Sequence, residues 1–153
     1  MKKKATILLV EDNCMDIELT LDALREARLD NDIRVVETGE AALDYLLGRG
    51  EFADRSAHPL PDIVLLDIKL PGISGIDVLK TIKGTPGLKR LPVIILTSSR
   101  DEGDRITSYD HGVNSYLVKP ISFDGFLEVI KTLTDYWLTL NINAPIEIEK
   151  PEE

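Results

Sequence analysis

Five residues with reactive or charged side chains stand where short apolar runs of the sequence end. They are Glu11 and Asp12 after the first run, Asp67 after the third, Thr97 after the fourth and Lys119 after the fifth. Together their side chains supply carboxylates, a hydroxyl and an ammonium, the groups that phosphoryl-transfer sites combine. If these five positions converge in the fold, they can bind a phosphoryl group and accept it.

The charges of these residues do not balance. Glu11, Asp12 and Asp67 carry three negative charges and Lys119 carries one positive charge, which leaves a surplus of two negative charges. Like charges held close together would force at least one carboxyl to take up a proton unless a cation offset them. Carboxylate oxygens with no His or Cys thiolate among them favour a hard ion, and Mg²⁺ is the one that exchanges its waters for phosphate oxygens.

We therefore expect a Mg²⁺ site at which a phosphoryl group is transferred. Asp67 is the nucleophile that accepts the group, Thr97 offers a hydrogen bond, and Lys119 with the metal neutralises the developing charge. Each motif also has an ordinary reading, because carboxylates after a strand often cap helices, and Thr-Ser-Ser and Lys-Pro are common in turns and loops. All of them together, in this order, favour the chemical interpretation.

The elements that must position these residues follow from the hydrophobic pattern. Amphipathic segments separate the apolar runs, which are too continuous to have a solvent-facing side. Strands buried on both faces indicate a parallel sheet with helices on each side, hence a doubly wound five-stranded α/β domain. The runs are Ile7–Val10, Ile33–Val36, Ile63–Leu66, Val93–Leu96 and Tyr116–Val118. In such a sheet the strand ends share one edge, where ligands bind.

Composition narrows the class of protein. The 153 residues are 43% hydrophobic, which fits one globular domain. No window reaches the roughly 18 apolar residues of a membrane helix, and the first apolar run is shorter than a signal peptide requires, so we expect a cytoplasmic protein with no membrane contact. The single cysteine, Cys14, excludes an intramolecular disulfide framework, and the net charge of −9 argues against nucleic-acid binding.

Two segments depart from the repeating pattern. Residues 48–61 form a polar, punctuated stretch that is longer than a usual connection, so we expect a surface excursion with His58 as an exposed loop histidine. Residues 141–153 form a short acidic tail, too short for an output domain and expected to be mobile at its end.

Four motifs resemble the receiver domain of two-component response regulators. They are VEDN at 10–13, LLDIKLPGISG at 65–75, LTSS at 96–99 and YLVKP at 116–120. The resemblance covers roughly residues 4–138 and implies a flavodoxin-like sheet of strand order 2-1-3-4-5. It also implies a receiver domain over residues 1–140 that carries no output domain. Such a protein is a phosphoacceptor regulator rather than an enzyme.

The resemblance also implies roles for the site residues. Asp67 would be phosphorylated by a sensor histidine kinase or a phosphotransfer protein, or would phosphorylate itself from a small donor with Mg²⁺. The metal would be held by Asp12 and Asp67 directly, by Glu11 through water and by the backbone carbonyl of Lys69. The phosphoryl group would be held by Thr97 and Lys119.

Further features of the family bear on switching. The Lys119–Pro120 bond would be cis, and Tyr116 would rotate inward as Thr97 moves; for the tyrosine, a half-buried strand aromatic with its hydroxyl in water is an equal alternative. The helix expected over 101–112 has only two large apolar anchors, Ile106 and Tyr109. Such an element should shift when phosphorylation adds charge nearby, and so change the contacts with a downstream protein target.

A narrower resemblance is to the single-domain regulators that partner phytochrome-type, light-sensing kinases of bacteria. It rests on the 48–61 excursion, the run GLKRLPVIILTSS and the pair Tyr136-Trp137. In that group the last strands and helices, with the C-terminal extension, support homodimers. Phe126, Tyr136 and Trp137 would suit such an interface, although core packing also explains Phe126.

Lys69 stands two residues beyond Asp67, and its side chain cannot act as an acid near neutral pH or readily position an attacking water. We therefore expect slow self-dephosphorylation and a long-lived phosphorylated state. The same lysine argues against a haloacid-dehalogenase-like phosphatase, which needs a second Asp there. A flavodoxin-like cofactor binder would want a phosphate loop where Glu11 and Asp12 stand, and a non-phosphorylated receiver-like binding module need not keep the full set.

Overall fold

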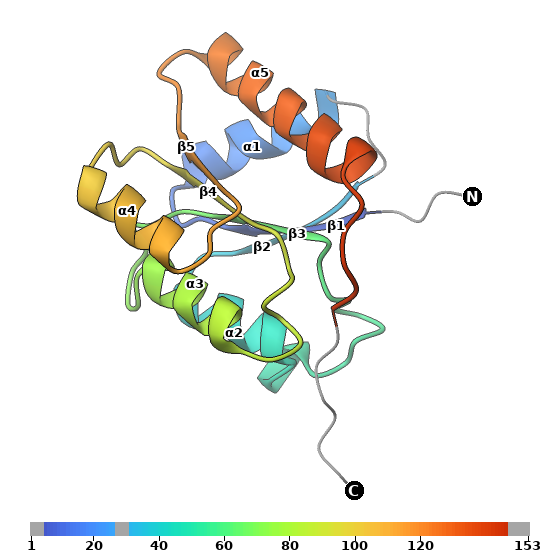
Figure 1. Cartoon of the computed structure of the whole chain (residues 1–153). Helices are drawn as coiled ribbons and strands as arrows, with labels where there is room; N and C mark the ends of the chain where they lie inside the picture. The colour runs from blue at the N-terminus through green and yellow to red at the C-terminus, as the bar shows by residue number, and fades with distance from the viewer. Residues whose placement is uncertain (1–4, 27–30, 147–153) are drawn as a thin grey trace, which may run out of the picture.

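The apolar runs form the strands of one parallel sheet in the computed structural model, which describes residues 5–26 and 31–146 (Figure 1). The strands are β1 (Ala5–Val10), β2 (Asn31–Val36), β3 (Ile63–Leu66), β4 (Val93–Thr97) and β5 (Ser115–Val118). Their order across the sheet is β2-β1-β3-β4-β5, and every pairing is parallel. The predicted fold class and strand order are confirmed.

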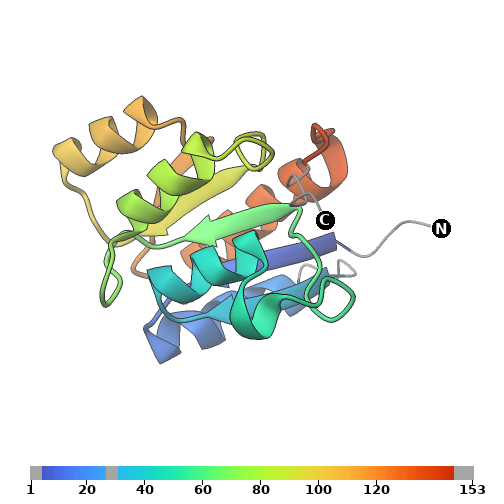
Figure 2. The ribbon, with the colours of Figure 1, turned by 90° about the horizontal axis from the view of Figure 1, so that it is seen from below.

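Helices cover both faces of the sheet. They are α1 (Cys14–Glu26), α2 (Gly39–Leu47), α3 (Gly75–Gly84), α4 (Glu102–Asp110) and α5 (Phe123–Thr134), the last continued by a π-helical turn over Asp135–Leu140. α1 and α5 lie above the sheet in Figure 1 and α2 and α3 below it, so the latter pair stands in front of the sheet in Figure 2. This is the doubly wound arrangement that the continuous apolar runs predict.

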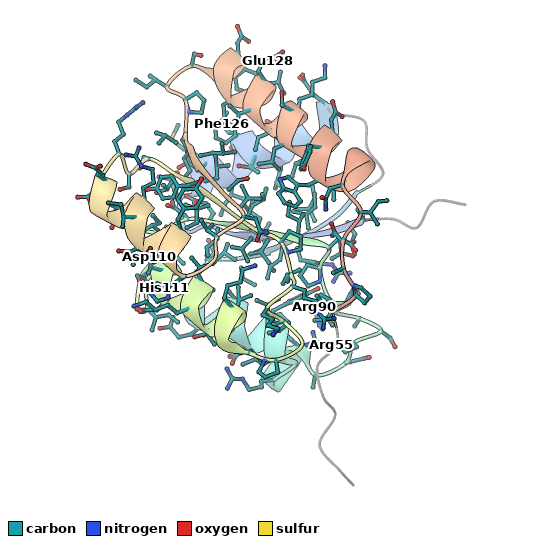
Figure 3. All side chains as sticks on the ribbon, viewed as in Figure 1. Arg55, Arg90, Asp110, His111, Phe126 and Glu128 are labelled. Carbon is teal, nitrogen blue, oxygen red and sulfur yellow. The ribbon has the colours of Figure 1, made fainter. Side chains whose placement is uncertain are left out.

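Alternate residues of each strand feed two separate cores. On β1, Leu8 packs with α2 and α3, whereas Leu9 packs with α1 and α5. The helices are amphipathic in the matching sense: on α5, Phe126 is 3% exposed and points to the sheet, whereas Glu128 faces solvent (Figure 3). Phe126 is therefore a core residue and not part of a surface, as one of its two sequence interpretations held.

The excursion between α2 and β3 is packed and hydrogen-bonded. Arg55 donates to the carbonyl oxygens of Tyr45 and Leu46 at 2.7 Å each, which caps the C-terminal end of α2. The Tyr45 hydroxyl donates to the carbonyl of Pro59 at 2.7 Å. His58 lies half-buried, edge-on to Tyr45 and Phe52 at ring-centroid distances of 5.9 and 5.1 Å. The prediction of an exposed histidine is wrong, because these aromatic rings enclose it.

The chain beyond α5 returns across the edge of the sheet where the strands begin (Figure 1). The side-chain amide of Asn143 donates to the carbonyl of Asp62 at 2.8 Å, and Ile146 packs against the core beneath α2 and α3. Residues 147–153, which hold all the acidic residues of the tail and for which mobility was expected, lie outside the described part of the chain. Residues 141–146 therefore join the turn after α5 to the opposite face of the sheet.

A lysine ties the start of β4 to its neighbours. The Lys83 ammonium donates to the carbonyls of Leu91 at 2.8 Å and Lys89 at 3.2 Å, and to the Asn114 side-chain oxygen at 3.0 Å. The same Asn114 oxygen accepts from the backbone of Val93 at 2.8 Å. Burial lowers the pKa of Lys83 to about 8. α3 is thereby linked to the chain before β4 and to the chain before β5.

Two isoleucines of the C-terminal segment provide a matched test of its packing. Ile146→Ala removes methyl groups that pack on the core, so the free energy of unfolding should fall by about 1–2 kcal/mol. Ile142 is 95% exposed, and Ile142→Ala should change the free energy of unfolding by less than about 0.5 kcal/mol. Urea denaturation of the three proteins measures both values, and equal stability of the two variants would contradict the packing of Ile146.

The lowered pKa of Lys83 predicts a pH-dependent stability. Between pH 8 and about 10.5, the ordinary pKa of a lysine, the folded protein loses this proton before the unfolded chain does. The unfolded chain then binds more protons, so the free energy of unfolding should rise with pH across this window. Urea denaturation as a function of pH should show the rise in the wild type and in Lys80→Met, an exposed control on α3, and not in Lys83→Met.

Candidate functional site

Strand register brings the predicted site residues to one edge. Val10 of β1 pairs with Leu66 of β3, so the next residues, Glu11 and Asp67, are neighbours, and the Asp67 amide donates to the Val10 carbonyl at 3.1 Å. Thr97 of β4 pairs with Val118 of β5 in the same way. The amide of the following residue, Lys119, donates to the Thr97 carbonyl at 2.8 Å.

The residues line one cavity of about 520 Å³ at this edge. Its walls include all four expected metal-site residues and the lysine: Glu11, Asp12, Asp67, Lys69 and Lys119. Thr97 is fully buried at the end of β4 and does not reach the cavity wall, where its neighbour Ser98 stands instead. The structure thus brings together the predicted carboxylates and ammonium, with the hydroxyl of Thr97 beneath them.

The Lys119 ammonium is the centre of the site. It contacts Asp16 Oδ2 at 2.8 Å, Asp67 Oδ2 at 3.1 Å and both Oε atoms of Glu11 at 3.2 Å. Its side chain is 9% exposed. Burial opposes the charge, but the hydrogen bond to Asp16 and the charges of Asp67 and Glu11 raise the pKa of Lys119 above its ordinary value. The lysine is therefore a cation at neutral pH.

Asp16 is a site residue that the sequence reasoning missed. It lies in the first turn of α1, which begins at Cys14 immediately beyond the end of β1, and it lines the same cavity. The signal was present in the sequence, because Asp16 follows Asp12 by four residues and a helix starting at the site edge directs its first turn toward the site. The ion pair with Lys119 is what identifies Asp16 as a site residue in the structure.

The two buried carboxyls differ in their protonation. Burial together with the adjacent Asp67 carboxylate raises the pKa of Glu11 to about 8. Burial also opposes ionisation of Asp67, but the interaction with Glu11 and the charge of Lys119 outweigh it and lower the pKa of Asp67. At pH 7 Asp67 is thus the ionised member and Glu11 the protonated one. The crowded carboxyls cannot all ionise without a further cation.

Asp67 has one free oxygen. Its Oδ1 atom is buried and has no hydrogen-bond partner among the described residues, whereas Oδ2 accepts from Lys119. A buried carboxylate oxygen without a partner is costly, and it calls for a ligand. A hard cation fits it, because Asp12, Asp67 and the chain at Lys69 offer oxygen atoms in the same cavity.

The carboxyl groups of the site are grouped around Lys119 and not around a position for a metal ion. No three His, Cys, Asp or Glu side chains of the described residues are placed to hold a metal as a group. Lys119 stands among the three carboxyl groups of Glu11, Asp16 and Asp67 instead. A metal at Asp67 Oδ1 would therefore rely on Asp12 and on the backbone oxygen at Lys69, with water completing its shell.

The loop after Asp67 is shaped by glycine. A side chain at Gly75 would place its Cβ 2.0 Å from the Asp67 carbonyl oxygen, so only glycine fits there. The Gly75 amide donates to the Ile68 carbonyl at 2.8 Å, and Gly72 has a φ of +77°, which favours glycine. These contacts hold the backbone next to Asp67 and leave Lys69 exposed at the cavity.

The segment after β4 is hydrogen-bonded to Tyr116 and to α4. The half-buried Tyr116 donates its hydroxyl to the Ser99 carbonyl at 3.2 Å, and the Ser99 hydroxyl contacts Asp104 Oδ2 at 2.7 Å. Thr97 Oγ1 accepts from the Ser99 amide at 3.2 Å. Tyr116 is thus a half-buried strand aromatic, as the alternative interpretation held, but its hydroxyl bonds to a backbone carbonyl and not to water alone. Its inward rotation stays a prediction.

α4 is weakly buried, although not in the predicted way. Ile106 and Tyr109 are 52% and 53% exposed, so they do not anchor the helix. Ser108 is its only buried residue. The helix is held by polar contacts at its ends and by α3, which makes its position easier to change than that of α5.

The Lys119–Pro120 peptide bond is trans, because the described residues contain no cis peptide bond. The cis prediction is therefore wrong. The trans isomer is the one that X–Pro bonds ordinarily prefer, by about 0.5–1 kcal/mol.

A second cavity, of about 380 Å³, lies between β5 and α5. Its walls are largely apolar and include Leu117, Val129, Leu133, Tyr136 and Trp137. Tyr136 is 50% exposed and packs edge-on against Trp137 at 5.2 Å. Of the three residues suggested for a dimer interface, Tyr136 and Trp137, in the π-helical turn after α5, reach this surface.

Comparison with known proteins gives consistent matches. The family model described as the response regulator receiver domain matches residues 7–131. Response regulator Rcp1 of Synechocystis sp. (strain ATCC 27184 / PCC 6803 / Kazusa) is 37% identical over 132 residues, which are 86% of this chain and 88% of Rcp1.

Two solved structures extend the comparison. The phosphorylated cyanobacterial phytochrome response regulator RcpA is 36% identical, with a TM-score of 0.87 over 92% of this chain and 99% of that one. The Mn²⁺-bound form of Rcp1 is 35% identical, with a TM-score of 0.84 over the same shares of the two chains. The fold, the family resemblance and its phytochrome-linked branch are thus confirmed together.

Proposed function

Because this chain belongs to the response regulator receiver domain family, we propose that Asp67 accepts a phosphoryl group from a sensor histidine kinase or phosphotransfer protein. The observation that carries the proposal is the buried Asp67 carboxylate: Oδ2 accepts from the Lys119 ammonium, and Oδ1 has no partner within the described part of the chain. The family consists of signalling proteins, so the group is received as a signal and not turned over as a substrate. Membership in the family leaves no place for the phosphatase and flavin-binding alternatives.

The chemistry follows from the two oxygens of Asp67. Oδ2 accepts from Lys119 and Oδ1 has no partner among the described residues. One of the two oxygens would form the bond to phosphorus, as the bond between phosphorus and the donor breaks and its electrons leave with the donor, and the other would remain for the metal. The ionised state of Asp67 at pH 7 makes it a nucleophile. Lys119 neutralises the charge that builds on the phosphoryl oxygens.

Mg²⁺ would be held by Asp12, Asp67 and the backbone carbonyl of Lys69, with Glu11 acting through water. When bound, the ion offsets the carboxylate charges and draws the phosphoryl oxygens toward Asp67. The oxygen-rich lining of the cavity and the free Oδ1 support this assignment. The related Rcp1 is known in a Mn²⁺-bound form.

The signal would leave through α4 and its neighbours. A phosphoryl group adds about −1.5 to −2 charges next to Thr97 and Lys119. A shift of Thr97 would act on the Ser99 amide. Ser99 is in turn hydrogen-bonded to Tyr116 through its carbonyl and to Asp104 through its hydroxyl. We expect the weakly buried α4 to move and the contacts with a downstream protein target to change.

The phytochrome-linked relatives support a more specific proposal. The donor would be a phytochrome-type, light-sensing kinase, and the protein would act in the cytoplasm as one receiver domain over residues 1–140 with a short tail. The apolar cavity between β5 and α5 would be the surface for a homodimer. In the described part of the chain, no helix combines the length and apolar character needed to cross a membrane.

Phosphorylation can be tested directly by mass. Incubation with acetyl phosphate and Mg²⁺ should add one phosphoryl group to the wild type, and Asp67→Asn should abolish the gain because the nucleophile is removed. Asp124→Asn, an exposed change of the same kind on α5, should be phosphorylated normally. Intact-mass spectrometry with and without Mg²⁺ measures the outcome, and an unmodified wild type would refute the proposal.

The lifetime of the phosphorylated state tests the role of Lys69. Lys69→Asn places a side chain that can hold a water beside the phosphoryl group, so dephosphorylation should be faster by roughly fivefold or more. Lys80→Asn, exposed on α3, should leave the rate unchanged. The loss of phosphoryl mass after donor removal gives the rates, and an unchanged or slower rate in Lys69→Asn would contradict the idea.

A further inference from the structure

Lys119 has a carboxylate partner that does not come from a strand end. Its contact with Asp16 Oδ2 is 2.8 Å, whereas its contacts with Asp67 and Glu11 are 3.1 and 3.2 Å. Asp16 is carried by α1. The lysine that the proposed function assigns to the phosphoryl group is therefore held most closely by a residue outside the predicted site.

The hydrogen-bonding capacity of Lys119 is already used. An ammonium has three N–H donors, and Lys119 faces four carboxyl oxygens from Asp16, Asp67 and Glu11. A phosphoryl oxygen can engage the ammonium only if one of these acceptors gives way. Which one does so depends on how easily water can replace the lysine.

Asp16 is the acceptor that can be released at least cost. Its side chain is 30% exposed, so water can take over its hydrogen bonds, whereas Glu11 and Asp67 are 3% and 9% exposed. An ion pair that water can reach contributes little net free energy. Withdrawing the ammonium from the buried Asp67 carboxylate, or from the buried carboxyl oxygens of Glu11, would leave a buried polar group unpaired and is more expensive. The phosphoryl group would also be repelled by the Asp16 charge in the same cavity.

The position of Asp16 is well defined by its helix. The Asp16 amide donates to Asn13 Oδ1 at 3.0 Å, and its carbonyl accepts from the Thr20 hydroxyl at 2.7 Å. A carboxylate in the first turn of a helix is favoured by the backbone dipoles. The contact with Lys119 is thus made from a fixed backbone.

We propose that Asp16 is a positioning residue that restrains Lys119 in the unphosphorylated protein and competes with the phosphoryl group for it. The proposal rests on the proposed function of Asp67 and adds a residue that sets how readily the phosphorylated state forms and how long it lasts. Asp16 acts through Lys119. Competition for the ammonium and repulsion of the phosphoryl group act in the same direction, so removing the carboxylate favours the phosphorylated state.

The test uses beryllofluoride, a phosphoryl mimic, at saturating Mg²⁺. Asp16→Asn should bind beryllofluoride about fivefold more tightly than the wild type, the effect of releasing one partly exposed ion pair. Asp16→Glu keeps the carboxylate and should return the affinity to within about twofold of the wild type. Asp22→Asn, an exposed change of the same kind on α1, is the matched control and should bind as the wild type does.

Isothermal titration calorimetry gives the affinities, and thermal unfolding verifies that each variant is folded. A second readout is the loss of phosphoryl mass after acetyl phosphate treatment, which should be slower in Asp16→Asn. If the wild type neither binds beryllofluoride nor gains a phosphoryl group, the proposed function fails. If the wild type does both while Asp16→Asn binds equally or more weakly, the function stands and the role of Asp16 is overturned.

Discussion

The ion cluster around Lys119 is the interaction on which the rest of the site depends. One ammonium, 9% exposed, holds together carboxyl groups from the ends of β1 and β3 and from the first turn of α1. Without this cation, burial would drive the carboxyls to their neutral forms. Glu11, with a pKa of about 8, is already neutral at pH 7, and the ionised state of Asp67 is maintained against burial by its hydrogen bond with Glu11 and by the charge of Lys119. Asp67 is therefore a nucleophile because both Glu11 and Lys119 stabilise its negative charge.

The cluster in turn depends on strand register. Glu11 and Asp67 meet because Val10 pairs with Leu66, and a slip of one residue would turn each side chain to the other face of the sheet. The register is enforced by two cores, since alternate residues of each strand pack on different pairs of helices. The apolar runs are therefore part of the chemistry, because their packing fixes the positions of polar groups that follow them.

The difference between local sequence patterns and contacts made far along the chain explains what could be predicted from the sequence. The strands, the helices and the convergence of the site residues follow from periodicity and from the positions of the polar residues after each run. The strand order came from the family resemblance that the four motifs carry. The sequence did not reveal contacts whose partners lie far along the chain. The exposure of His58 was predicted wrongly because it packs on aromatic rings of α2 and the following loop. The packing of Ile146 on the core and the contact of Asp16 with Lys119 were not found. The prediction that Ile106 and Tyr109 anchor α4 was wrong for a related reason. An apolar residue anchors a helix only if its face of the helix meets the core, and both of these side chains are exposed.

The contrast between the helices identifies the direction in which a change at Asp67 can travel. α5 places Phe126, Ile130 and Leu133 in the core, so displacing it would expose apolar surface at about 25 cal/mol per Å². α4 buries only Ser108 and is joined to the site by Ser99, which bonds both Asp104 and Tyr116. Moving α4 exchanges hydrogen bonds with water at small net cost. A charge added at the strand ends would therefore act most on α4, the element whose displacement costs least. α4 presents Ile106 and Tyr109 to solvent, where a partner could contact them.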